Sequence, residues 1–256
     1  MGLSAADPKR LQVLLAIEEG WQAFCSAPWT FLLFQLLVLL VALPFAGLAA
    51  AGVVRLAGEE LPALHPIAAG IALVVGALGY VLVALWGLVG LTRAAWRSLE
   101  GQRPDFRCFR RWDGAAGGRL VLSTLLLVLV VGLTGLLAGL LSTGLGRIHA
   151  VLASLPLLLF AAAYVWFLVT QKFLIQLSLF GERQPLGTLR AGLEGVNPSW
   201  WLVLWLAVVE TGMHAIALLF SYGGLFVIFP LMLCISTAAY RQLFGTDDRT
   251  GLLQEG

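Results

Sequence analysis

The sequence predicts an all-α membrane protein with six transmembrane helices, arranged as three parallel hairpin repeats that each follow a cytoplasmic interfacial amphipathic helix. Three observations lead to this prediction. Of 256 residues, 60% are hydrophobic and only 12% are charged, about half the charged share of an ordinary soluble chain. Six apolar runs each approach or exceed the roughly 20 residues that a bilayer crossing needs. The basic residues are divided very unevenly among the connecting segments.

The six expected spans follow from the apolar runs in chain order. They cover residues 29–53, 68–92, 119–142, 152–176, 200–220 and 223–241. Only the residues from Ser221 to Gly224 separate the last two runs, which together are too long for one crossing. We expect Tyr-Gly-Gly to form a tight turn there.

Orientation follows from the positive charges. If the six runs alternate in direction, all the Lys and Arg residues except Arg55 and Arg147 fall on one side. Positive loops stay in the cytoplasm, so we expect both termini to be cytoplasmic. The expected location is a bacterial cytoplasmic (inner) membrane, with the first span acting as an uncleaved anchor.

An internal repeat is suggested by the segments that follow every second span. They read AAWRSLEGQRP (94–104), LIQLSLFGERQP (174–185) and AAYRQLFG (238–245), and all three contain Leu-x-Gly. Pro8, Pro104 and Pro185 each open a short amphipathic stretch. We therefore divide one integral membrane domain into units of approximately 8–101, 104–181 and 185–245, followed by a flexible tail, 246–256.

The short stretches have the pattern of helices lying in a membrane interface. In the first, apolar side chains lie broadly on one face: Leu11, Leu14, Leu15, Ile17, Trp21 and Phe24. In the second, aromatic residues recur every three positions at Phe106, Phe109 and Trp112. Arginines are interleaved with them at Arg107, Arg110 and Arg111. We expect the aromatics to enter the headgroup layer and these arginines to contact anionic lipid.

Longer segments resemble a known group of proteins. LLAIEEGWQAFCSAPW, PLGTLRAGLEGVNPSWW and the ending AAYRQLFG are similar to bacterial multi-pass families described as glycerophosphodiester phosphodiesterase membrane domains, and to their uncharacterised relatives. The resemblance implies a membrane part that can accompany a soluble phosphodiesterase domain. The metal site of that soluble domain has no counterpart here, so the resemblance implies no catalysis and supplies no site residues.

Two ionisable residues, Glu210 and His214, interrupt the fifth apolar run four residues apart. Counting about 1.5 Å per residue from Trp200 places Glu210 about 15 Å deep, near the middle of the bilayer. The two residues either face a polar cavity as a titratable pair or fix helix packing with polar residues opposite, the candidates being Thr211, Gln171 and Gln176. Lys172 is expected near the cytoplasmic boundary, with its amine extended to the interface. These six residues form the candidate intramembrane polar site.

Several functional classes find no support in the sequence. There is no G-x-S-x-G, H-E-x-x-H or phosphate-binding glycine loop, so we expect no enzyme, cofactor or metal. The basic residues are dispersed along a membrane boundary, which argues against nucleic-acid binding. Two functions remain open. One is a non-catalytic protein that organises anionic membrane lipids, a protein partner or further copies of itself at the cytoplasmic face. The other is a transporter or permease that uses Glu210 and His214.

Overall fold

The computed structural model describes residues 11–57, 65–182, 184–220 and 222–253, and this part of the chain contains helices but no strand. Six helical segments are long and apolar enough to cross a membrane. The structure is therefore that of an all-α integral membrane protein, as predicted. The principal helices are α1 (Val13–Ser26), α2 (Pro28–Leu56), α3 (Pro66–Leu99), α4 (Phe106–Arg110), α5 (Gly114–Gly146), α6 (Ala150–Thr170), α7 (Leu174–Gln176), α8 (Pro185–Val196), α9 (Trp200–Phe220) and α10 (Tyr222–Phe244).

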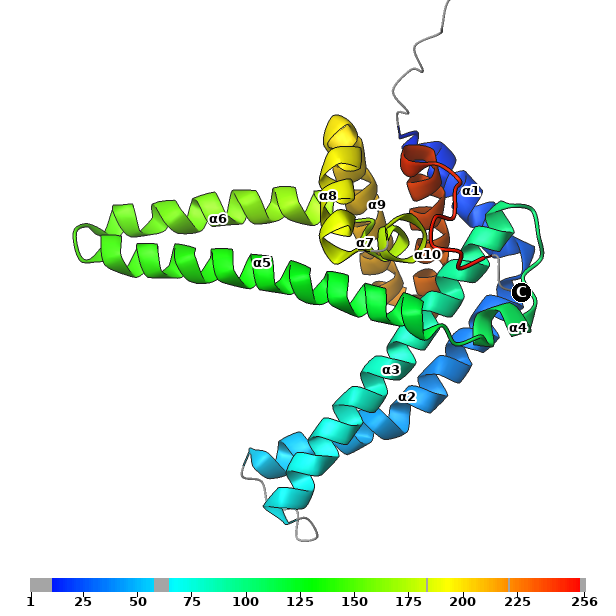
Figure 1. The fold of residues 1–256 in the computed structure, drawn as a ribbon, viewed down its shortest axis with the longest axis horizontal. Helices are drawn as coiled ribbons and strands as arrows, with labels where there is room; N and C mark the ends of the chain where they lie inside the picture. Colours follow the sequence, from blue (N-terminus) through cyan, green and yellow to red (C-terminus); the bar gives the residue numbers. More distant parts are fainter. Residues whose placement is uncertain (1–10, 58–64, 183, 221, 254–256) are drawn as a thin grey trace, which may run out of the picture.

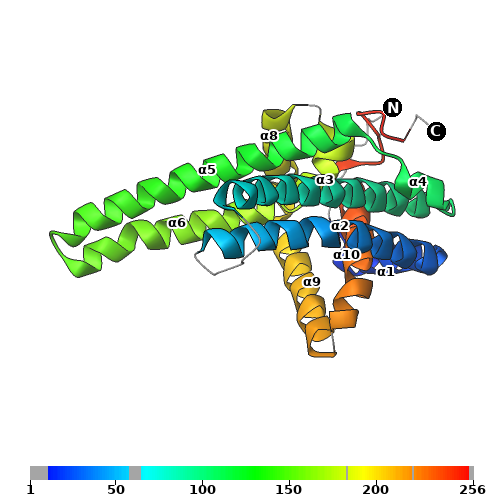
Figure 2. The same ribbon diagram turned by 90° about the horizontal axis from the view of Figure 1, so that it is seen from below.

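The long helices form three antiparallel pairs: α2 with α3, α5 with α6, and α9 with α10. The pairs radiate from a common centre in three different directions (Figures 1 and 2). Away from that centre they present apolar side chains outward. In the most apolar 18-residue stretch of α6, no residue is buried by protein. Because such a surface is unfavourable in water, the radiating parts are the segments suited to hydrocarbon.

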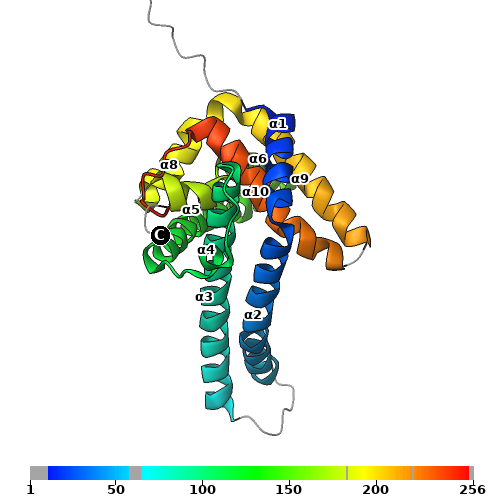
Figure 3. The same cartoon turned by 90° about the vertical axis from the view of Figure 1, so that its right-hand side faces the viewer.

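The common centre is a packed region that we call the hub, made of residues 11–34, 89–120, 169–182, 184–206 and 231–253 (Figure 3). At its middle, the buried Trp96 ring of α3 lies 4.3 Å from the Phe180 ring and 6.1 Å from the Tyr240 ring of α10. A second aromatic group joins Phe31 and Phe34 of α2 to Phe109 of α4. Residues far apart in the sequence thus share one core.

Helix boundaries follow from proline, capping residues and glycine. Proline occupies the first turn of α2, α3 and α8, where a backbone N–H would have no partner. Asp113 accepts a hydrogen bond from the backbone N–H of Ala116 at 2.8 Å and so caps α5. Gly101 and Gly245 have φ of 77° and 96° and end α3 and α10, a conformation that costs glycine little.

Two predicted boundaries differ from the observed ones. The fourth span was expected to run to residue 176, but α6 ends at Thr170, and α7 and a π-helix (Leu177–Gly181) follow a break at 171–173. The break turns the chain into the hub. The Tyr-Gly-Gly sequence was expected to form a turn, but α10 begins at Tyr222. Gly224 lies in its first turns, where an added Cβ would meet the Ala217 carbonyl oxygen at 2.5 Å.

The apolar face of α1 also differs from the expected one. Its buried side is formed by Val13, Ala16, Gly20 and Phe24, and it packs on α10. Leu14 and Trp21, which were expected on the same face, point outward and are 82% and 54% exposed. Ala16 and Gly20 on this buried side are small, so α1 can approach α10 closely. Pro8, expected to open this stretch, lies outside the described residues.

The end of the chain, expected to be a flexible tail, packs on the hub as far as it is described. The backbone N–H of Arg249 donates to the Phe180 carbonyl at 2.9 Å, and the Thr250 hydroxyl donates to the Leu179 carbonyl. Asp248 accepts from the backbone N–H of Leu253 at 2.7 Å, and Leu252 is buried. The tail therefore covers the π-helix.

Gly20 is a point of close contact between α1 and α10, since an added Cβ would lie 2.5 Å from the Ile235 Cα. We expect Gly20→Val to force the two backbones apart and to lower the free energy of unfolding by about 3 kcal/mol, the upper range for overpacking. Thermal unfolding of the purified protein in detergent measures this. Gly139→Ala is the control, because nothing lies within 4 Å of the Cβ that it adds; equal melting temperatures for the two variants would contradict the α1 packing.

Candidate functional site

Glu210 lies on α9 with 8% of its surface exposed, and its carboxylate is held by two other segments. Lys172, in the break after α6, donates to Oε2. The Ser236 hydroxyl of α10 donates to Oε1 at 3.0 Å. One carboxylate thus joins α9, α10 and the end of α6, and the positive charge of Lys172 compensates its charge where water is largely excluded.

Lys172 was expected to extend its amine toward an interface, and the structure places it instead in the ion pair with Glu210, with 13% of its side chain exposed. Trp200 donates to the Trp166 carbonyl at 3.4 Å, and Glu210 pairs with Lys172, so α9 contacts the last part of α6 and the break after it. The depth of about 15 Å expected for Glu210 stays a prediction.

His214 does not bond to the Glu210 carboxylate. Its Nδ1 lies 2.8 Å from the backbone carbonyl oxygen of Glu210, and because that oxygen only accepts, Nδ1–H is the donor. Thr211 likewise turns to its own helix, donating to the Ala207 carbonyl at 2.7 Å. The expected Glu210–His214 pair is therefore replaced by an ion pair between Glu210 and Lys172.

The two glutamines lie on the hub side of this ion pair. Gln171 donates from Nε2 to the Leu189 carbonyl of α8 at 2.9 Å and packs against Gly192, where an added Cβ would lie 2.9 Å from Gln171 Oε1. Gln176 is 1% exposed, and its Oε1 has no hydrogen-bond partner among the residues that the structure describes. Gln171 thus connects the break to α8, while neither glutamine is hydrogen bonded to Glu210.

An apolar groove of about 390 Å³ runs between α6 and α9 beside the ion pair. Lys172 and Thr211 are its two polar lining residues. The remaining lining is aliphatic: Val165, Leu168, Val169, Leu204, Ala207 and Val208. The groove has the chemistry of an acyl-chain surface with one charged group at its edge.

The arginine-rich segment expected to contact lipid is fixed to the hub by a buried arginine. Arg93 of α3, only 2% exposed, donates from Nη1 to the carbonyls of Cys108 and Arg111, both at 3.1 Å. Its Nη2 lies 4.0 Å from Asp113 Oδ2. The Trp86 indole donates to the Arg110 carbonyl at 2.8 Å. Two side chains of α3 therefore hold the backbone of residues 108–111.

This fixation decides which side chains of α4 face outward. Arg107 and Arg110 are exposed, whereas Arg111 is partly buried. Phe109 was expected in the headgroup layer but is fully buried against Phe31 and Phe34, because the α4 backbone is drawn onto the hub. Phe106 packs on Phe34, and only Trp112 of the three aromatics remains exposed, at 51%.

Sequence reasoning missed the role of Arg93. Arg93 is one of the basic residues at the end of the second span, and its surroundings in the sequence, LTRAAWR, resemble those of any arginine at a helix end. The carbonyl groups that it binds come from a segment 15 and 18 residues away. The neighbouring Ala94 and Ala95 indicate that this part of the helix packs closely on protein. They do not indicate that Arg93 binds the backbone of residues 108–111.

Breaking the ion pair tests its contribution to packing. Because each single change leaves an uncompensated charge, we expect Lys172→Met or Glu210→Gln to lower the free energy of unfolding by about 3 kcal/mol. The double variant should lose less than the sum of the two changes. Chemical unfolding in detergent measures the cycle. The matched control is the exposed pair Arg190–Glu194, at 2.7 Å with side chains 79% and 64% exposed, for which we expect little effect. Additive losses at Lys172 and Glu210 would contradict a coupled pair.

Cysteine labelling tests the fixation of α4 by Arg93. Burial raises the pKa of the Cys108 thiol above its ordinary value, so the reactive thiolate is scarcer than in a free cysteine at any pH below that raised pKa. At pH 8 we expect maleimide to modify the exposed Cys25 well before Cys108. The charge of Arg93 itself lowers the Cys108 pKa, but burial is the larger effect, so Arg93→Gln should release α4, expose the Cys108 thiol and accelerate its labelling, as read by mass spectrometry.

The control for that labelling is Arg107→Gln, which changes an exposed arginine next to Cys108 and should leave its protection intact. Cys108 protection that survives Arg93→Gln would show that Arg93 does not hold the segment.

No protein-family model, no curated protein and no solved structure matches this chain. Within the described residues, no three His, Cys, Asp or Glu side chains form a group that could hold a metal ion. The family resemblance drawn from sequence motifs remains an expectation. The functional interpretation therefore rests on the geometry of the hub and of α4.

Proposed function

We propose that this protein is a non-catalytic multi-pass membrane protein that organises lipids, and through them partner proteins or further copies of itself, at the cytoplasmic face of its membrane. One observation carries the proposal: the outward arginines Arg107 and Arg110 belong to a helix whose backbone is fixed to the hub by the buried Arg93. Because the backbone beneath them is fixed, these arginines keep a defined arrangement, which a ligand-binding surface needs and a loose loop does not provide.

The charge of this surface favours anionic lipid as its ligand. Arg107 and Arg110 are exposed and lie within five residues of the exposed Trp112 in the sequence, and aromatic and basic side chains together are typical of the headgroup layer. Leu14 and Trp21 of α1, which are also exposed, offer a second apolar surface at the hub. We infer that the hub lies at the headgroup level, with the hairpins extending into hydrocarbon.

The three-unit organisation and the cytoplasmic orientation belong to the same proposal. Each short helix packs on a helix of the preceding unit: α4 on α3, α8 on α5 and, closing the ring, α1 on α10. Gly101 and Gly245 share a left-handed conformation at matching positions, whereas Gly181 lies in a π-helix. Arg55 and Arg147 lie near the far ends of α2 and α5, and the other described basic residues lie at the hub end, which we infer to be cytoplasmic.

The permease alternative rests on the groove between α6 and α9, which reaches Lys172. Against it, the Glu210 carboxylate is bound on both oxygens, and His214 bonds to the main chain. These contacts favour packing over proton transfer. A transport role predicts a proteoliposome flux that disappears when Glu210 and His214 are both replaced.

Lipid selectivity tests the proposed function directly. We expect Arg107→Gln/Arg110→Gln to reduce enrichment of phosphatidylglycerol over phosphatidylcholine around the protein, since each arginine contributes about 1 kcal/mol near an anionic surface. Reconstitution in mixed-lipid nanodiscs followed by lipid analysis of the bound layer measures the enrichment, and added salt should weaken it. Arg111 is retained in this variant because its side chain is partly buried.

Matched controls come from the far ends of the hairpins. Arg55→Gln and Arg147→Gln remove the same number of charges but lie away from the hub, so they should leave the enrichment at the hub unchanged. An unaltered phosphatidylglycerol preference in the α4 variant, with its melting temperature preserved, would contradict the proposal.

A further inference from the structure

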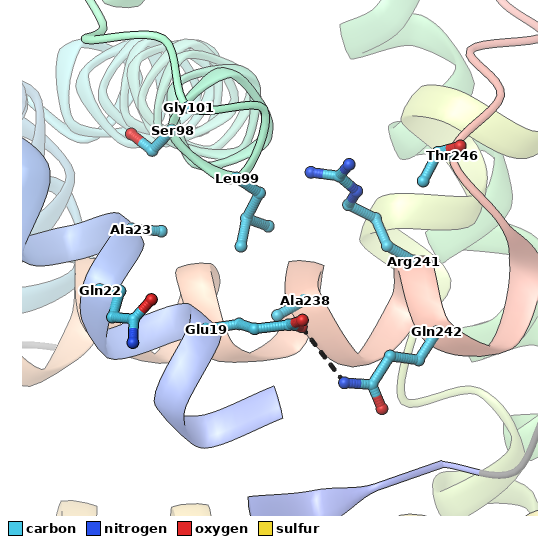
Figure 4. A pocket seen from close by; sticks show the side chains of 10 residues that line it. All are labelled: Glu19, Gln22, Ala23, Ser98, Leu99, Gly101, Ala238, Arg241, Gln242 and Thr246. Carbon is cyan, nitrogen blue, oxygen red and sulfur yellow. Dashed lines mark hydrogen bonds between the residues drawn. The ribbon is translucent and has the colours of Figure 1, made fainter. Parts of the chain in front are cut away.

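A polar cavity of about 430 Å³ opens in the hub between α1, the end of α3 and α10 (Figure 4). Its volume lies within the range of about 300–1,000 Å³ typical of small-molecule sites. The lining includes two charged residues, Glu19 and Arg241, and the neutral polar residues Gln22, Ser98, Gln242 and Thr246. The cavity is separate from α4 and from the ion pair of Lys172 with Glu210.

Arg241 supplies the positive side of the cavity. Its guanidinium carbon lies 5.2 Å from the ring centroid of Trp96, which is fully buried and donates to Glu100 at 2.9 Å. The side chain of Arg241 makes no hydrogen bond or ion pair within the described part of the chain. Figure 4 shows its nitrogen atoms directed into the cavity. A guanidinium held by one ring face keeps its N–H donors free for a ligand.

Glu19 supplies the negative side from the facing helix α1 (Figure 4). Its Oε2 accepts from Gln242 Nε2 at 3.2 Å. Gln242 is itself fixed, because its Oε1 accepts from the backbone N–H of Gln12 at 3.0 Å. The carboxylate is therefore positioned by a neutral amide, and Arg241 does not neutralise it by direct contact.

We propose that this cavity binds a zwitterionic phosphate–ammonium group of the phosphoethanolamine type. The phosphate would meet Arg241, and the ammonium group would meet Glu19. The two side chains have opposite formal charges, so a ligand carrying one sign alone would be opposed by one of them. Ser98, Gln22 and Thr246 add neutral hydrogen-bonding groups. The site lies beside the proposed headgroup level, and its ligand is either a lipid headgroup or the free soluble compound.

Binding to the purified full-length protein in detergent separates these possibilities. The probes are dihexanoyl phosphatidylethanolamine, dihexanoyl phosphatidylglycerol and free O-phosphoethanolamine, titrated by isothermal calorimetry. We expect the wild type to prefer phosphatidylethanolamine over phosphatidylglycerol. Arg241→Gln should weaken binding of both lipids about tenfold or more, the loss of one charge-assisted hydrogen bond. Glu19→Gln should remove the preference for ethanolamine without weakening phosphatidylglycerol binding.

The controls are Arg190→Gln and Glu194→Gln, which change exposed charges on α8 and should leave all affinities unchanged. Binding of the lipid alone identifies a headgroup site, and binding of the free compound as well identifies a soluble-ligand site. Equal affinity of the wild type for both lipids would overturn the proposal, as would unchanged binding in a folded Arg241→Gln variant. If that variant does not fold, Glu19→Gln decides, because a retained ethanolamine preference overturns the proposal. None of these outcomes depends on the α4 arginines.

Discussion

Concentration of the buried core in the hub, where the three helix pairs meet, is the constraint on which the rest of this structure depends. Along the hairpins, apolar side chains gain little by meeting one another, because hydrocarbon tails are equally apolar. At the hub, by contrast, Trp96, Phe180 and Tyr240 come from three parts of the chain and pack in one cluster. The direction of each hairpin is therefore set where it leaves the hub, and the short helices act as the connecting elements.

Polar contacts complete this core and make it specific. Arg93 joins α3 to α4, and the ion pair of Lys172 with Glu210 joins the end of α6 to α9. Hydropathy alone does not predict either contact. Removal of one partner from such a contact costs more than the contact contributes, because the remaining charge is buried without compensation. The same core presents charged groups at its surface, at α4 and in the cavity between α1, α3 and α10. Packing and proposed lipid recognition thus use one set of elements.

The helices were predictable because composition and length decide them: six apolar runs can satisfy their backbone groups in hydrocarbon only as helices. The start of α8 at a proline and the end of α3 before a glycine were also predictable, because these boundaries depend on the local backbone preferences of the two residues. The partner of Glu210 was not, since Lys172 is 38 residues away. The burial of Phe109 was hidden because its three-residue spacing suits a membrane interface and a protein core equally.

The division between a protein-packed hub and lipid-covered hairpins can be measured on the unmodified protein. Photolabelling with a carbene precursor dissolved in the bilayer, mapped by mass spectrometry, reports which side chains meet hydrocarbon. We expect strong labelling along Ala150–Thr170, whose apolar window has no buried residue, and little labelling of 231–240, where nine of ten residues are buried. Equal labelling of the two segments would contradict this division.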